Sequence, residues 1–102
     1  MIYNKLIRDK IPEIIRNKNL TPVVHTANDE EYREKLECKL KEEVSEYLDN
    51  HNPEELVDVL EVIYAICSLE RISIEELETI REKKREERGG FEKRIILKEV
   101  KE

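Results

Sequence analysis

The sequence predicts a mainly all-α fold: an antiparallel helical hairpin, a third helix, and a four-helix-bundle core completed by oligomerisation. Three observations predict this class. Apolar residues recur every three or four positions from Tyr32 to Leu48, as on one face of a helix. The connection after Asn50 is short enough to require an antiparallel turn. Residues 56–67 are apolar nearly all round, so one partner helix cannot cover them.

The first 28 residues mix basic side chains with short apolar pairs, and Pro12 and Pro22 exclude one long helix. Pro12 fits the first turn of a short helix that ends at about residue 18. The β-branched residues of 21–26 predict a short edge strand, because Pro22 lies near its start, where a missing N–H group is tolerated.

A long helix is expected to begin after Asn28 or Asp29, since either side chain can cap it. Glu30 and Glu31 would then lie in the first turn, where the helix dipole favours negative charge. The helix should end near Asn50.

The next helix restarts within a few residues. Asn52 is expected to cap it, Pro53 suits its first position, and Glu55 is placed to close a capping box. The two helices therefore form the predicted hairpin.

A third helix is predicted from Ser73 to Arg88, with a capping box between Ser73 and Glu76 and a stop at the glycine pair of residues 89–90. Residues 91–100 are expected to form a terminal strand or an extended arm. A chain of 102 residues is long enough for one domain, which we assign to residues 1–102.

Charge and composition exclude several classes of function. The net charge of -6 has the wrong sign for a general nucleic-acid coat. The longest nearly apolar run is too short to cross a bilayer, so no membrane partner is expected. Cys38 and Cys67 lack the spacing of a zinc site or a disulfide framework, which favours a reducing cytoplasm.

Carboxylates stand where the helical pattern calls for apolar side chains. Glu43 lies on the apolar seam of the long helix, and Glu46 follows three residues later. Glu55 and Asp58 repeat this spacing in the next helix, with Asp58 inside its apolar run, where we expect little solvent. Both pairs lie near the connecting turn, so they should converge into one acidic cluster.

Converging carboxylates repel one another unless a cation or protons neutralise them. Oxygen ligands without histidine or cysteine favour Mg²⁺, with Mn²⁺ as a substitute, or Ca²⁺, and bound Mg²⁺ is often shared with substrate phosphates. The sequence therefore indicates phosphate chemistry. The open alternative is that these acids are a solvated face paired with Lys39 and Lys41, and that Glu55 is only a capping residue.

Basic residues near the glycine pair are candidates for holding a polyphosphate, chiefly Lys84 and Arg88. The same alternating charge is also typical of a solvated helix face. A P-loop is excluded, because Gly90 is followed by Phe91 and not by Lys-Ser/Thr.

The motifs Glu42-Glu43-x-x-Glu46 and Glu55-x-x-Asp58 resemble those of the all-α nucleotide pyrophosphohydrolases, and the chain looks like a MazG-like protein. The opening Tyr-Asn-Lys-Leu-Ile-Arg-Asp-Lys-Ile-Pro of residues 3–12 and the Arg-Glu-Glu-Arg-Gly-Gly-Phe of residues 85–91 resemble the small phosphoribosyl-ATP pyrophosphohydrolase-like, house-cleaning branch.

The resemblance implies a homodimer or homotetramer that uses Mg²⁺ to hydrolyse a nucleoside triphosphate to the monophosphate and pyrophosphate. It implies a catalytic role for Glu42, which would orient water, and for Glu43. Together with the local basic charge it also implies phosphate contacts near the N-terminus. The implied metal ligands are Glu43, Glu46, Glu55 and Asp58, and the implied phosphate-binding residues at the N-terminus are Lys5, Arg8 and Lys10.

Two rival functions come from other classes. A non-catalytic dimeric helical module, regulatory or antitoxin-like, would use the acids to balance basic residues across its interface. A carboxylate-bridged di-iron bundle needs Glu-x-x-His motifs, and neither His25 nor His51 stands in that relation to a glutamate.

Overall fold

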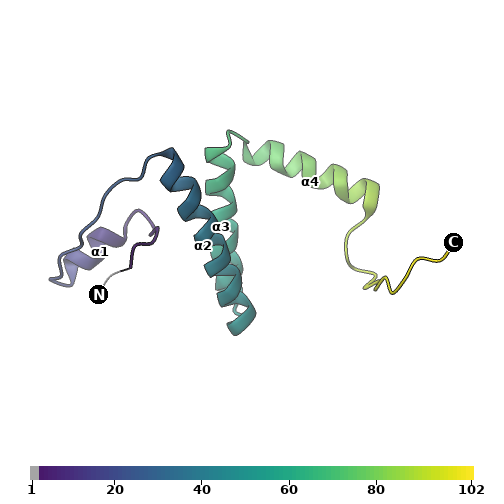
Figure 1. The fold of residues 1–102 in the computed structure, drawn as a ribbon, viewed down its shortest axis with the longest axis horizontal. Coiled ribbons are helices and arrows are strands. Elements are labelled where there is room, and N and C mark those ends of the chain that lie inside the picture. The colour runs from purple at the N-terminus through teal and green to yellow at the C-terminus, as the bar shows by residue number, and fades with distance from the viewer. Residues whose placement is uncertain (1–2) are drawn as a thin grey trace. The chain divides into compact units, whose positions relative to one another are not determined.

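The computed structural model describes residues 3–102 and, over these residues, contains four α-helices and no β-strand (Figure 1). The all-α prediction is confirmed. The chain divides into two compact units, one ending at Arg71 and the other beginning at Ile72. No described helix has both the length and the apolar character that crossing a membrane requires. The helices are α1 (Ile11–Asn17), α2 (Asp29–Asn50), α3 (Pro53–Leu69) and α4 (Ile74–Arg88).

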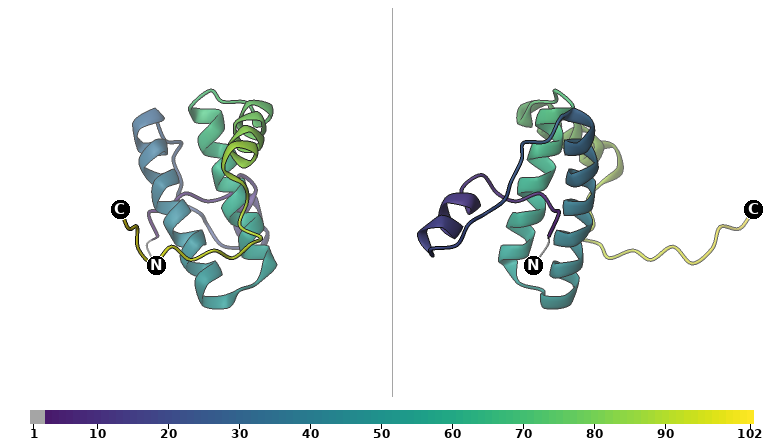
Figure 2. Two further views of the ribbon diagram at one scale, coloured as in Figure 1. Left: turned by 90° about the vertical axis from the view of Figure 1, so that its right-hand side faces the viewer. Right: turned by 60° about the vertical axis from the view of Figure 1, so that its left-hand side comes forward.

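Helices α2 and α3 form the predicted antiparallel hairpin and lie side by side in both views of Figure 2. Asn28 caps α2, since its Oδ1 accepts a hydrogen bond from the Glu31 amide at 2.9 Å. His51 ends the helix in the left-handed region, at a φ of 53°. Asn52 then caps α3 by accepting from the Glu54 amide at 3.0 Å. These local contacts fix the turn that brings the two helices together.

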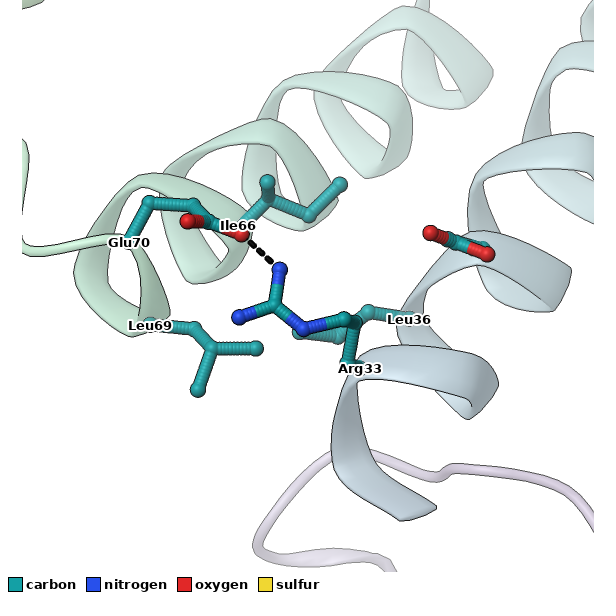
Figure 3. Close-up of a pocket in the computed structure, with 6 residues that line it drawn as sticks. Arg33, Leu36, Ile66, Leu69 and Glu70 are labelled. Atoms are coloured by element: carbon teal, nitrogen blue, oxygen red, sulfur yellow. Dashed lines mark hydrogen bonds and ion pairs between the residues drawn. The ribbon is translucent and has the colours of Figure 1, made fainter. Parts of the chain in front are cut away.

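Apolar packing between α2 and α3 is concentrated on a few buried side chains: Leu36, Val62 and Cys67. At the end of the hairpin away from the connecting turn, Arg33 pairs with Glu70 across a small pocket (Figure 3). Leu36, Ile66 and Leu69 line this pocket. The aliphatic contacts therefore hold this end of the hairpin, and the candidate metal site lies nearer the connecting turn.

A large part of the apolar surface of α3 is exposed in the single chain. Val57 is 60% exposed and Leu60 is 44% exposed, and Leu48 of α2 is 61% exposed. Val57 and Leu60 are three residues apart and so share one face of α3, and neighbouring exposed apolar side chains of this kind often mark a protein–protein contact. This agrees with the prediction that one partner helix does not cover α3.

The strand predicted at residues 21–26 is wrong. This segment is irregular, with Val23 at 97% exposure. β-branched residues favour a strand, but within the described residues the segment has no neighbouring strand with which to form hydrogen bonds. Residues 91–100 also form no strand and are an exposed arm, which was the alternative considered for them.

Helix α4 begins and ends as predicted. Ser73 Oγ accepts a hydrogen bond from the Glu76 amide at 3.0 Å, which satisfies one of the unpaired donors of the first turn. Gly89 ends the helix at a φ of 82°, a backbone conformation that side chains with a Cβ rarely adopt.

Candidate metal centre

Three carboxylates converge beside the turn between α2 and α3. Glu43 comes from α2, and Glu55 and Asp58 come from the first turns of α3. Each of the three offers one oxygen, and these oxygens lie within 4.8 Å of one another. The i, i+3 spacing brings Glu55 and Asp58 onto one face of α3, and the short turn brings that face to Glu43. The structure thus brings together three of the four predicted metal ligands.

Glu46, the fourth predicted ligand, lies outside this group of three among the described residues. It is still near enough for its charge to act on Glu43. Glu46 therefore adds negative charge beside the cluster, and its role as a ligand stays a prediction.

Glu43 is the buried member of the cluster, at 7% exposure. Burial raises the pKa of the Glu43 carboxyl, and the negative charges of Glu46 and Asp58 raise it further. The ammonium group of Lys39 acts in the opposite direction without cancelling the rise. Ionisation of Glu43 thus costs more free energy in the metal-free protein than it does for a free carboxyl group, and a further cation would relieve that cost.

Two carboxylate oxygens of the cluster are buried without a partner. Glu43 Oε2 and Glu55 Oε2 accept no hydrogen bond within the described chain. Buried polar atoms without a partner are rare in folded proteins and often mark a water or ion site. The donor set consists only of carboxylate oxygens, which are hard ligands of the kind Mg²⁺ and Mn²⁺ prefer. The residues present therefore fit a divalent cation.

The predicted capping role of Glu55 is wrong. The Asn52 side chain accepts from the Glu54 amide, while Glu55 has a buried, unpartnered Oε2 and joins the carboxylate cluster. A carboxylate that closes a capping box accepts from the amide of the capping residue. Glu55 is thus more than a helix-start residue.

Lys39 lies at the site, although the sequence indicated only that it pairs with glutamates on a solvated helix face. Its Nζ lies 3.4 Å from Glu42 Oε2 and 3.4 Å from Glu43 Oε1, and its side chain is 18% exposed. The signal was present as the i, i+3 and i, i+4 spacing of oppositely charged residues. Its burial depends on the packing of the hairpin and could not be obtained from that spacing.

The N-terminal segment supplies two further cations to this region, Lys5 and Arg8, whose phosphate-binding roles stay predictions. Lys5 Nζ lies 3.3 Å from Glu42 Oε1, and Arg8 Nη2 lies 2.7 Å from Asp58 Oδ1. Lys35 of α2 also donates a hydrogen bond to the Asn4 carbonyl at 2.9 Å. The segment before α1 is therefore tied to both helices of the hairpin.

Glu42 anchors this segment and lies outside the group of three carboxylates. Burial alone raises its pKa, but hydrogen bonding and charge from Lys5 and Lys39 outweigh this effect and hold the pKa below its usual value. Glu42 is thus ionised at neutral pH while it is paired with two lysines. Its water-orienting role stays a prediction.

Asp58 is better solvated than the sequence indicated. Its side chain is 36% exposed, although its sequence neighbours are aliphatic. The reason is that adjacent residues lie about 100° apart around a helix, so the aliphatic side chain of Val57, itself exposed, does not cover Asp58.

The other three predicted phosphate-binding residues are Lys10, Lys84 and Arg88. Lys10 precedes α1 at its N-cap position. Lys84 and Arg88 lie on α4, where they line a shallow hollow with Ile80, Lys83 and Glu87. Their phosphate-binding roles stay predictions.

Comparison with known proteins gives a partial relative. A stretch of 42 residues is 52% identical to an uncharacterized protein of Mycolicibacterium smegmatis (strain ATCC 700084 / mc(2)155). The match covers 41% of this chain and 43% of that protein, so it spans less than half of either. No family model matches the chain, and no solved structure matches it.

Proposed function

We propose that this chain is a Mg²⁺-dependent nucleoside triphosphate pyrophosphohydrolase of the MazG-like type. The observation that carries the proposal is the buried Glu43, whose Oε2 accepts no hydrogen bond and which forms a group of three carboxylates with Glu55 and Asp58. Such a group is unfavourable without a cation and has the oxygen chemistry that Mg²⁺ requires. The resemblance of the two acidic motifs to this class supports the same reaction.

Each residue of the site has a role in this proposal. Glu43, Glu55 and Asp58 hold the cation, and Glu46 contributes further negative charge. Bound Mg²⁺, or Mn²⁺ in its stead, supplies neutralisation of phosphate oxygens and an activated water. Lys5 and Arg8 lie beside the cluster and are suited to stabilise charge on the departing pyrophosphate. Lys10, Lys84 and Arg88 are further candidates for phosphate contacts.

Release of pyrophosphate from a panel of normal and damaged nucleoside triphosphates tests this function. With Mg²⁺ we expect at least one triphosphate to give its monophosphate and pyrophosphate. Glu55→Gln should reduce the rate at least about a hundredfold, since it removes one charge from the cation site. Glu54→Gln changes the exposed neighbour and serves as the matched control. Turnover that needs no divalent cation, or equal rates for the two variants, would contradict the proposal.

The proposed enzyme acts as a homodimer or homotetramer in the cytoplasm. The exposed Leu48, Val57 and Leu60 support association of the hairpin with a second copy. The two cysteines are free, which agrees with a reducing compartment.

Light scattering is expected to give at least twice the chain mass of 12.2 kDa at micromolar concentration. Leu60→Asp should shift the protein toward the monomer, because it would bury a charge in the proposed interface. Val23→Asp, at a fully solvated position outside the hairpin, should leave the mass unchanged. A stable wild-type monomer would overturn the proposed assembly.

A further inference from the structure

We propose that Arg8 and a divalent cation exchange at Asp58. In the metal-free protein the guanidinium group neutralises the carboxylate, and cation binding releases it toward the phosphates of the substrate. This inference rests on the proposed function, and it adds an order of events: the cation binds first, and Arg8 is then free for the nucleotide.

The contact between Arg8 and Asp58 carries the first step. Arg8 Nη2 lies 2.7 Å from Asp58 Oδ1, a charge-assisted hydrogen bond to a member of the carboxylate group. A cation held by Asp58 would bring a second positive charge beside the guanidinium group, and the two like charges repel one another even when each contacts a different carboxylate oxygen. Arg8 and the cation therefore compete at Asp58.

The exposure of the ion pair allows this exchange without rearrangement of the core. The Arg8 side chain is 55% exposed and that of Asp58 is 36% exposed. An ion pair between such solvated groups contributes little free energy, so a divalent cation can replace the arginine. Glu43, by contrast, is buried and keeps its contact with Lys39 on its own helix.

The anchors of the N-terminal segment keep Arg8 near the site after its release. Lys5 pairs with Glu42, and Lys35 donates to the Asn4 carbonyl, so α2 holds the chain just before Arg8. Neither of these two anchoring contacts uses a carboxylate of the group of three. Arg8 can then change its partner while the segment stays attached, and its planar fork matches a phosphate group.

Mn²⁺ binding without nucleotide tests the competition by isothermal titration calorimetry. Arg8→Gln removes the competitor and should lower the Kd for Mn²⁺ about two- to fivefold, the range expected for loss of an exposed ion pair. Arg8→Lys keeps the positive charge and should stay near the wild-type Kd. Arg16→Gln removes an exposed arginine of α1 and changes the net charge of the protein by the same amount as Arg8→Gln. This control should leave the Kd for Mn²⁺ unchanged.

The same substitution should act in the opposite direction on the nucleotide. For a triphosphate that the enzyme hydrolyses, Arg8→Gln should raise KM although it strengthens cation binding. In nuclear magnetic resonance spectra, the chemical shift of the Arg8 side-chain Nε–H group should move toward that of a solvated arginine when Mg²⁺ is added. The Asp58→Asn protein should show the solvated chemical shift without metal.

The outcomes separate this inference from the function on which it rests. Tighter Mn²⁺ binding by Arg8→Gln together with a higher KM supports the exchange. If wild type binds Mn²⁺ and Arg8→Gln binds it equally or less tightly, the exchange is wrong and the proposed metal site stands. If neither protein binds Mn²⁺ at millimolar concentration, the proposed metal-dependent function is itself wrong.

Discussion

Asp58→Asn is expected to reduce Mg²⁺-dependent pyrophosphate release at least about a hundredfold and to change the free energy of unfolding of the metal-free protein by less than about 1 kcal/mol. The substitution keeps the shape of the side chain and removes one charge from the proposed cation site. Its stability effect is small because the Arg8–Asp58 pair that it breaks is solvated, with the Arg8 side chain 55% exposed and that of Asp58 36% exposed.

This result distinguishes the enzyme from a non-catalytic helical module. If Asp58 formed a structural ion pair buried in an interface, the same change would cost about 3 to 5 kcal/mol. Thermal melts of both proteins, with ethylenediaminetetraacetic acid and with Mg²⁺, measure the difference. A large loss of metal-free stability with activity retained would refute the catalytic assignment.

Glu43→Gln is expected to abolish activity and at the same time to stabilise the metal-free protein at pH 7, by about 1 kcal/mol. Burial and neighbouring negative charge raise the pKa of this carboxyl above its ordinary value of 4.5, so the folded protein binds the proton more tightly than the unfolded chain does. The contribution of Glu43 to stability is therefore fully present below about pH 4.5 and is lost as the pH rises through the folded-state pKa.

Chemical denaturation at about pH 4 and at pH 7 checks the direction of this pH dependence. The stability advantage of Glu43→Gln should appear at pH 7 and become much smaller at pH 4, where the wild-type carboxyl is mostly protonated in the folded and the unfolded states alike. Glu37→Gln, at an exposed position of the same helix, is the control and should show no such pH dependence. A Glu43→Gln protein that is less stable at pH 7 would show that the ionised carboxylate is satisfied within the chain.

The helices were predictable because their signals are local. Asn28, Asn52 and Ser73 each cap a helix through their own side chain, and Gly89 ends one through its backbone conformation. The hairpin follows from these caps, because a turn of two residues leaves only an antiparallel return. The strand at residues 21–26 failed for the opposite reason: a strand requires a partner, and composition does not supply one.

The candidate site was predictable in its backbone placement and less so in its contacts. Spacing along α2 and α3 was sufficient to bring Glu43, Glu55 and Asp58 to one end of the hairpin. The burial of Lys39 between two glutamates, and the contact of Arg8 with Asp58 across 50 residues, depend on tertiary packing. Spacing rules do not describe such packing.

Crystals grown with Mn²⁺ and measured near the manganese absorption edge test the cation site most directly. We expect an anomalous difference peak among the carboxylates of Glu43, Glu55 and Asp58, at coordination distance from an oxygen of each, and no such peak in Asp58→Asn crystals under the same conditions. A Mn²⁺ peak located away from these carboxylates, or a wild-type protein that hydrolyses triphosphates with these three carboxylates not coordinating metal, would contradict the proposed metal centre.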